Sequence, residues 1–291
     1  MSLIVNGLIE GILTGAVYAL MASGLTLIFG VMEIINVAQG IFVILGAYLS
    51  FTLSHYMHID IFLGLLITIP VMFLIGLGIE WAFIRRIQRN RVMLSILVTY
   101  AVSLLIEGLL NLVFSATMVQ LQASYIDTSF YVFGFYLPYI YIFSFILSVV
   151  LLATLYLIVH RTQFGASMRA AMQNRTAATL IGIDVERISA ITFGIGVALA
   201  AVGGLSFGAT NAFNAASSYD LISRLLVIIV LGGMGSLRGA LFASLFMLII
   251  SDLTAVLWSP VWSSTVFFVL LVILLIMRPQ GLFGALEGRK Q

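Results

Sequence analysis

The segment GILTGAVYALMASGLTLIFGVM, residues 11–32, decides the fold, because it carries no charged side chain along its whole length. A helix that crosses a bilayer needs about 20 predominantly apolar residues, and this segment supplies them. Residues 92–118 form a similar window with a single acid, Glu107. The sequence therefore predicts an all-α, polytopic bundle of transmembrane helices. The other charge-free windows are residues 34–59, 61–79, 128–159, 188–219 and 253–277.

The composition of the chain supports this fold class. Of its 291 residues, 62% are hydrophobic and 8% are charged, whereas a soluble domain carries about 25% charged residues. No stretch has a soluble composition, so a single membrane domain is expected over residues 1–291. The absence of cysteine excludes disulfides, thiolate catalysis and zinc–cysteine sites. The apolar N-terminus lacks a basic region and a cleavage site, and we expect it to form the first span.

Residues 225–251 interrupt the regular series of windows. Two short apolar pieces, residues 225–237 and 239–251, meet at the glycine-rich run GGMGSLRG of residues 232–239. A break in a membrane helix is tolerated only where protein or water satisfies the freed backbone groups. The sequence therefore predicts a broken or tightly turned helix near residues 225–251. The total is eight or nine spans, depending on whether the two pieces cross the membrane separately.

Positive charges are gathered in three places along the chain. Because positively charged loops stay on the cytoplasmic side, all three groups are expected there. The linkers at residues 55–60, 120–136 and 211–223 lack Arg and Lys and are expected outside, with Arg224 as an exception at the edge of the last. Nine crossings then place the N-terminus outside and the C-terminus in the cytoplasm. The three groups are Arg85, Arg86, Arg89 and Arg91; Arg161, Arg169, Arg175 and Arg187; and Arg278, Arg289 and Lys290.

The longest polar stretch is the cytoplasmic loop of residues 161–187. Its residues 167–180 are rich in Ala, Met and Gln, which predicts a helix that stops near Gly182. An amphipathic helix of this kind lies on the membrane surface or docks in a groove of a partner. Because the loop has no Lys or Trp, docking in a partner is the favoured interpretation. The apolar face of this helix consists of Met168, Ala171, Met172 and Leu180.

Several short motifs occur in a fixed order along nearly the whole chain. Residues 165–183 follow the pattern Gly-x3-Arg-Ala-x2-Gln-Asn-x2-Ala-Ala-x-Leu-x-Gly-Ile. The other motifs are GLTLIFGVM at 24–32, INVAQG at 35–40, GAY at 46–48, GGMGS at 232–236 and RPQGLFG at 278–284. Together they resemble the motifs of the branched-chain amino acid permease family of ABC importers. The pattern at residues 165–183 is similar to that family's coupling loop.

The resemblance implies an ATP-driven importer of branched-chain or related amino acids in the bacterial inner membrane. In such an importer two permease subunits pair, as identical or as related chains. Two cytoplasmic ATPase subunits hydrolyse ATP, and a periplasmic binding protein delivers the substrate. Besides these proteins and membrane lipid, no nucleic-acid partner is expected. The residues implied to couple to the ATPase are Gly165, Met168, Arg169, Met172, Gln173, Asn174, Ala177, Ala178, Leu180, Gly182 and Ile183.

The chain lacks the motif needed to hydrolyse ATP itself. A P-loop has the pattern Gly-x4-Gly-Lys-Ser/Thr, because its lysine reaches the phosphates. The only lysine of this chain is Lys290. We therefore expect the chain not to be an enzyme and to bind no cofactor or metal. ATP and Mg²⁺ are expected in the partner ATPase subunits.

Polar residues at membrane depth are candidates for a translocation path, because they are costly unless they face the bundle interior or water. Asn36, Gln39 and Gly40 belong to the INVAQG motif. Glu107 and Asn111 share one helix face at i, i+4 spacing. The alternative role for these side chains is an interhelical hydrogen bond that holds the bundle together. Asn211, Asn214 and Asp252 are expected at the interface with solvent.

Two positions depart from the family's motifs. Gln39 stands where the family often has histidine, so no titrating imidazole is present there. Glu33 stands where many members have a basic residue, which weakens the positive-inside signal of the loop between the first two spans.

Two other classes of membrane protein are alternatives to an importer. An ion-coupled secondary transporter of a small neutral solute needs a coupling site, and Glu107 is the one deep acid available for it. An intramembrane enzyme is disfavoured, because the chain has no His-Glu-x2-His, Gly-x-Gly-Asp or cysteine nucleophile. Among importers, amides and urea are alternative substrates, and specificity rests largely with the binding protein.

Overall fold

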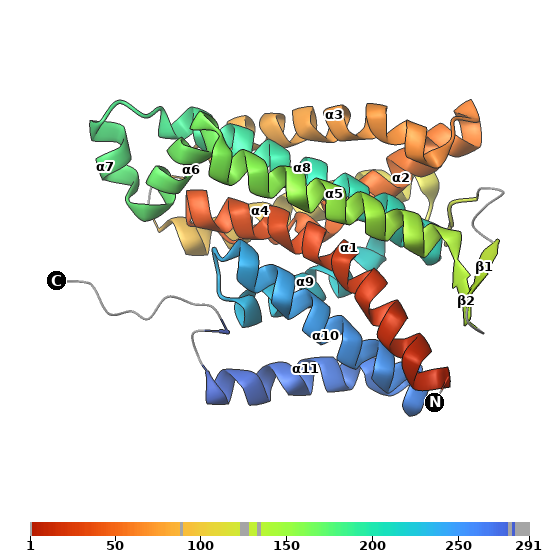
Figure 1. The fold of residues 1–291 in the computed structure, drawn as a ribbon. Helices are drawn as coiled ribbons and strands as arrows, with labels where there is room; N and C mark the ends of the chain where they lie inside the picture. The colour runs from red at the N-terminus through yellow and green to blue at the C-terminus, as the bar shows by residue number, and fades with distance from the viewer. Residues whose placement is uncertain (1, 88–89, 123–127, 133–134, 279–280, 283–291) are drawn as a thin grey trace.

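The computed structural model describes residues 2–87, 90–122, 128–132, 135–278 and 281–282. Within these ranges nine helices are long and apolar enough to cross a membrane, which confirms the predicted all-α membrane bundle (Figure 1). They are α1 (Ser2–Met32), α2 (Gln39–Met57), α3 (Ile61–Ile79), α4 (Arg91–Phe114), α5 (Tyr139–Arg161), α8 (Val185–Thr210), α9 (Ser218–Gly232), α10 (Leu237–Leu257) and α11 (Pro260–Met277).

Short elements connect these helices. A π-helical turn, η1 (Glu80–Ile84), prolongs α3, and a 3-10 turn, η2 (Ala215–Ser217), precedes α9. Two more helices, α6 (Gln163–Gln173) and α7 (Arg175–Leu180), lie between α5 and α8. Strands β1 (Ser129–Val132) and β2 (Phe135–Pro138) form an antiparallel hairpin in which Ser129 is opposite Pro138.

The hairpin corrects the expectation that residues 128–159 form one apolar helical window. The helix starts only at Tyr139, because Pro138 occupies its N-cap position, and the residues before it pair as strands. A proline costs little at a helix start, where its missing N–H would have no partner within the helix. An apolar run without charges does not distinguish a strand from a helix, so this boundary was not visible in the window.

The bundle has two ends that differ in what they carry (Figure 1). The α6–α7 end holds α6, α7 and the last turns of α11, and the hairpin end holds the start of α1 and the β1–β2 hairpin. Arg85, Arg91 and Arg175, from two of the predicted basic groups, line one small cavity at the α6–α7 end. The C-terminal segment reaches the same end, since the Leu282 amide donates to the Leu231 carbonyl. Arg89, Arg289 and Lys290 lie outside the described residues.

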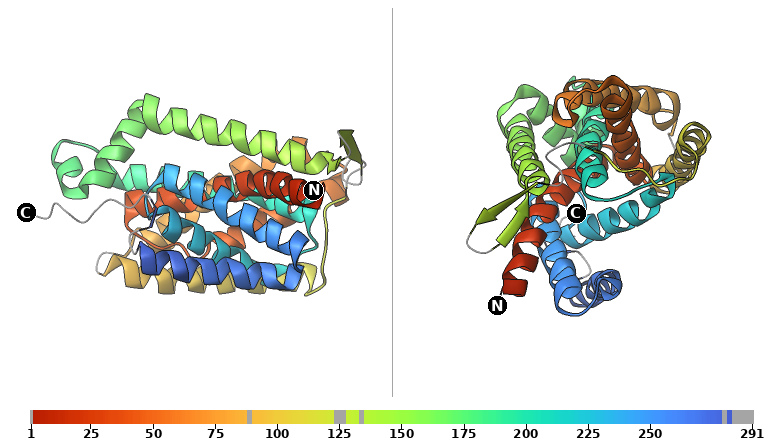
Figure 2. Two further views of the ribbon diagram at one scale, coloured as in Figure 1. Left: turned by 60° about the horizontal axis from the view of Figure 1, so that its bottom comes forward. Right: turned by 90° about the vertical axis from the view of Figure 1, so that its right-hand side faces the viewer.

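Helices α1 and α8 form the middle of the bundle. In the most apolar window of each helix, the buried share of the residues is 72% for α1 and 78% for α8, whereas it is 11% for α11. In the view along the bundle α11 lies at its edge (Figure 2). Close approach depends on glycine: a Cβ atom at Gly204 of α8 would lie 2.1 Å from the Val43 carbonyl oxygen of α2. The middle of the bundle is therefore closely packed, and its rim is available to lipid or other subunits.

The glycine-rich break expected near residues 225–251 is a tight turn between two full spans. Helices α9 and α10 meet at residues 233–236, where Gly233 and Gly235 have positive φ angles of 90° and 87°. The two apolar pieces looked short because Arg224, Arg238 and Asp252 interrupt the charge-free runs. Both helices continue through these charged residues, so the pair contributes two of the nine spans.

Candidate functional site

Helix α6 folds back closely onto the end of α5. Thr162 caps it, since its hydroxyl accepts a hydrogen bond from the Gly165 amide at 3.0 Å. A Cβ atom at position 165 would lie 2.2 Å from the Ile158 carbonyl oxygen, so only glycine fits there. The Arg169 guanidinium donates to the Val159 carbonyl. These contacts fix the position of α6 against the membrane helix that precedes it.

The single helix predicted over residues 167–180 is two helices. Asn174 leaves the helical conformation, and its side-chain oxygen accepts a hydrogen bond from the Ala177 amide at 2.9 Å, which starts α7. An asparagine at such an N-cap position satisfies a backbone donor that the first turn of a helix leaves free. The predicted stop is confirmed, because Gly182 follows α7 with a φ angle of +88°.

The break at Asn174 also divides the predicted apolar face. Met168, Ala171 and Ala178 are buried against the bundle, and Met172 is half-buried. In contrast, Leu180 and Ile181 are 83% and 75% exposed at the tip of α7. The expectation of one continuous apolar face is thus wrong, because the two helices point in different directions. Gln173, Ala177 and Gly182 are exposed, and Ile183 is half-buried.

An inner ionic cluster lies beneath α7 and joins it to other helices. Arg85 and Glu186 form an ion pair between the end of η1 and the start of α8. Burial lowers the pKa of the Arg175 guanidinium, and the nearby Arg91 lowers it further, while acidic neighbours oppose the shift. A displacement of α7 would therefore disturb the starts of both α4 and α8. The cluster consists of Glu80, Arg85, Arg91, Arg175 and Glu186.

Asn36 and Gln39 are fully buried in the middle of the bundle. The Asn36 amide nitrogen donates to the Gln39 side-chain oxygen at 3.1 Å, and the Gln39 nitrogen donates to the Gly196 carbonyl of α8 at 3.1 Å. The non-helical segment 33–38 is satisfied by hydroxyl groups of α4, because the Ile35 and Val37 amides donate to side chains of that helix. These hydrogen bonds tie the start of α2 to α8 and α4.

The remaining predicted path residues lie in different places. Gly40 packs on the start of α9, where a Cβ atom would lie 2.4 Å from the Ser218 carbonyl oxygen. Glu107 accepts a hydrogen bond from the Tyr219 hydroxyl at 2.6 Å, and Asn111 is exposed on α4. Helix α4 is peripheral, with 22% of its apolar window buried. The structure thus does not bring Glu107 and Asn111 together with the central amides, and their role in transport stays a prediction.

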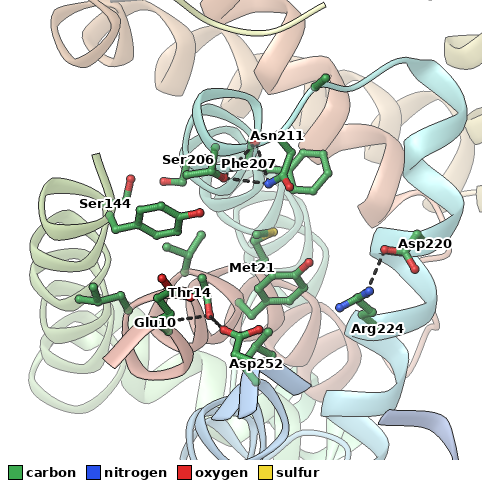
Figure 3. A pocket seen from close by; sticks show the side chains of 17 residues that line it. Glu10, Thr14, Met21, Ser144, Ser206, Phe207, Asn211, Asp220, Arg224 and Asp252 are labelled. Carbon is green, nitrogen blue, oxygen red and sulfur yellow. Dashed lines mark hydrogen bonds and ion pairs between the residues drawn. The ribbon is translucent and has the colours of Figure 1, made fainter. Parts of the chain in front are cut away.

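A larger polar cavity lies at the hairpin end, between α1, α5, α8, α9 and α10 (Figure 3). It has a volume of about 360 Å³. Glu10 and Asp252 lie on one side of it, and Asp252 accepts a hydrogen bond from the Thr14 hydroxyl at 2.9 Å. Arg224 lies across from them and pairs with Asp220 at 2.9 Å. We call this space the hairpin-end cavity.

The sequence pattern did not identify this cavity. Asp252 was expected at the interface with solvent, yet it lies inside α10 and lines the cavity. Arg224 was expected at the edge of an outer linker, but it belongs to α9. A signal was present, since Asp220 and Arg224 stand at i, i+4 spacing and form the ion pair that this spacing allows. Of the three residues assigned to the interface, Asn211 also lines the cavity, whereas Asn214 caps η2.

Comparison with known proteins identifies the family of this chain. Residues 7–275 match the family model of the branched-chain amino acid transport system permease component. The chain is 26% identical to the permease protein LivH of the high-affinity branched-chain amino acid transport system of Salmonella typhimurium, over 97% of this chain and 96% of the relative.

Two further relatives extend the comparison. A probable branched-chain amino acid transport permease, LivH of Methanocaldococcus jannaschii, is 28% identical over 95% of this chain and 92% of its own length. The permease LivM of Escherichia coli is 29% identical over 42% of this chain and 29% of its own length. No solved structure matches the chain. The match over nearly all of the membrane bundle shows that this chain belongs to the family of branched-chain amino acid transport permease components.

Proposed function

We propose that this chain is the permease subunit of an ATP-driven importer of branched-chain or related amino acids. It pairs with a second permease, works with two cytoplasmic ATPase subunits and receives its substrate from a periplasmic binding protein. The branched-chain amino acid transport function of its full-length relatives supports the substrate class. The partial likeness to LivM supports a related chain as the second permease.

The observation that carries this proposal is the exposed apolar tip of α7. Leu180 and Ile181 are the large apolar side chains that the structure leaves exposed in the connection between α5 and α8. Burying each such side chain in a partner's groove contributes about 1.5–3 kcal/mol. A cytoplasmic ATPase subunit with an apolar groove is the partner that this position fits, because the surrounding arginine-rich end belongs in the cytoplasm.

The contacts around α7 give a route from the ATPase to the membrane helices. A push on α7 acts on α8 through the short link at residues 181–184 and on α4 through the inner ionic cluster. Helix α8 is hydrogen-bonded to Gln39 at the start of α2. Rigid-body movement of packed helices of this kind is how such transitions usually proceed. The hairpin end then faces the periplasm, in the bacterial inner membrane.

Purification of the detergent-solubilised chain with its bound proteins tests the proposal. We expect one or two P-loop ATPases and a second permease to co-purify, and leucine uptake by the reconstituted complex to require ATP and the binding protein. The double variant Leu180→Glu/Ile181→Glu should lose the ATPase and uptake together. Gln163→Glu is the control, because it adds a charge to the same exposed segment without removing an apolar contact.

Transport by this chain alone would contradict the proposal. If the purified chain alone transports leucine without ATP, the chain is a secondary transporter and Glu107 becomes its first candidate coupling site. In that case Leu180→Glu/Ile181→Glu leaves uptake unchanged.

A further inference from the structure

We propose that the hairpin-end cavity is a site for a free, zwitterionic amino acid within this subunit. Asp252, with Glu10 at the rim, holds the ammonium group, and Arg224 faces the carboxylate. This inference rests on the proposed function and narrows its substrate class to molecules with a free α-amino group. Amides and urea, which carry no ammonium group, would not use this site.

The first argument is charge. The cavity is lined by three carboxylates, Glu10, Asp220 and Asp252, and by one guanidinium, Arg224. The negative charge of Asp220 is balanced by its ion pair with Arg224. Among the described residues, Glu10 and Asp252 have no ion pair, and the Asp252 side chain accepts its hydrogen bond from Thr14 alone. The Asp252 carboxylate is half-buried and therefore favours a cationic partner, which an ammonium group at this wall supplies, while Glu10 is exposed at the rim.

The second argument is the fixed position of Arg224. Its Nε atom donates to Asp220 at 2.9 Å, and its Nη2 atom donates to Ser264 of α11 at 3.0 Å. The guanidinium carbon also lies 5.6 Å from the centre of the Phe267 ring. Within the described residues its Nη1 atom has no hydrogen-bond partner. An arginine held at three points with one nitrogen free is suited to receive a carboxylate.

The third argument concerns the walls and the volume of the hairpin-end cavity. Ser144 of α5 is 2% exposed, lines the cavity, and its hydroxyl has no hydrogen-bond partner among the described residues. Buried hydroxyl groups are normally satisfied, so this one is available to a bound molecule. Val17, Met21 and Leu248 provide apolar surface between the charged walls. A volume of about 360 Å³ is near the lower end of small-ligand sites, about 300–1,000 Å³.

These features define the ligand by chemistry. It carries a cation, an anion and an apolar side chain that Val17 and Met21 can contact. The excess of carboxylates disfavours a second negative charge, so acidic amino acids should bind worse than leucine. N-acetylation removes the cation and should abolish binding.

Alkylation of a single cysteine tests the site directly, because the chain has no cysteine of its own. Ser144→Cys places a thiol in the cavity wall of the reconstituted complex. We expect saturating leucine to slow its reaction with a small maleimide about tenfold, and N-acetylleucine to have no effect. Thr117→Cys, at an exposed position outside the cavity, is the control whose rate should not respond to leucine. Reaction is followed by mass on this chain, so cysteines of the partner subunits do not interfere.

Charge-removing variants in the Ser144→Cys background complete the test. Asp252→Asn should weaken leucine protection about tenfold or more, since it removes one member of a desolvated charge pair, and Glu10→Gln should weaken it less. Glu33→Gln removes an exposed carboxylate far from the cavity and should leave protection intact. Each variant must keep the alkylation rate measured without leucine, which shows that the cavity is still folded.

The possible outcomes separate this inference from the proposed function. Alkylation needs no ATP, so leucine protection supports the site even if uptake proves independent of the ATPase. Absence of leucine protection in a complex that shows ATP-driven uptake overturns the site alone. Equal protection by N-acetylleucine, or protection by Na⁺ in place of leucine, also overturns it, because the cavity would then bind apolar molecules or a coupling cation.

Discussion

The two ends of the bundle use charged side chains in opposite ways. At the α6–α7 end, the Arg85–Glu186 ion pair lies at the surface, with side chains 50% and 59% exposed, beside an apolar tip that nothing in the described part of this chain covers. At the hairpin end, Asp252 and Arg224 line a polar cavity inside the bundle. The difference agrees with the two proposals, that the first end contacts another protein and that the second holds a small molecule.

Between the ends, the middle of the bundle must be rigid for one end to influence the other. Gly204→Ala should have a larger effect than any substitution at either end, because the new Cβ atom would lie 2.1 Å from the Val43 carbonyl oxygen. Overpacking of this kind costs about 1–3 kcal/mol or more. The melting temperature of the purified complex measures the loss, which should abolish function at both ends. Gly78→Ala is the matched control, since nothing lies within 4 Å of its Cβ position.

A smaller effect, confined to the α6–α7 end, is expected for Arg175→Gln. The substitution removes a half-buried positive charge that lies near Glu80 and Glu186 in the inner ionic cluster. Stimulation of ATP hydrolysis by the loaded binding protein should fall several-fold, while leucine protection of Ser144→Cys should not change. Loss of protection at the hairpin end would contradict the separation of roles.

The converse test at the hairpin end is Thr14→Val. It removes the hydroxyl that donates to Asp252 but keeps the shape of the side chain. The loss of one hydrogen bond to a carboxylate is worth about 1.5–3 kcal/mol at most, so the concentration of leucine needed for half-protection should rise about tenfold. Basal ATP hydrolysis should be unaffected. Thr154→Val is the control, because its hydroxyl bonds only to the backbone of its own helix, at Val150.

The smallest effect is expected for Glu186→Gln, which breaks the exposed ion pair with Arg85. Exposed pairs contribute about 0–1 kcal/mol, because water and salt screen them. The melting temperature and the ATP-driven uptake rate should therefore stay close to those of the unaltered complex. A large loss of uptake would mean that this exposed pair, and not Arg175 alone, connects α7 to the membrane helices.

The sequence was sufficient to predict the spans that lack charges, because length and hydropathy alone select a membrane helix. It failed where a charge is inside the bundle. Asp220, Arg224 and Asp252 were taken as helix boundaries, although their neighbours continue as helix. Asp220 and Arg224 pair within α9, and Asp252 comes to line the same cavity only after α9 and α10 fold together. The same failure hid the hairpin-end cavity, whose walls come from five helices far apart in the chain.

Local chemistry was predictable where it depends on one residue. Gly182 ends α7 as expected, because a positive φ angle favours glycine. Asn174 carried the signal for a second helix start, but the composition around it, rich in helix-forming residues, concealed that signal. Buried pairs such as Asn36 and Gln39 were recognised as unusual from the sequence, whereas their hydrogen-bond partner on α8, the Gly196 carbonyl, required the tertiary structure.

The non-helical segment 33–38 has a consequence for genetic engineering of this chain. Connections between helices usually accept foreign peptides, because they lie at the surface. Here Asn36 and Ala38 are buried. The Ile35 and Val37 amides, between α1 and α2, already donate hydrogen bonds to the Ser95 and Thr99 hydroxyls. An epitope tag inserted after Asn36 should therefore prevent expression of the protein, whereas the same tag after Ala116, in an exposed connection, should be accepted and detectable on the purified protein.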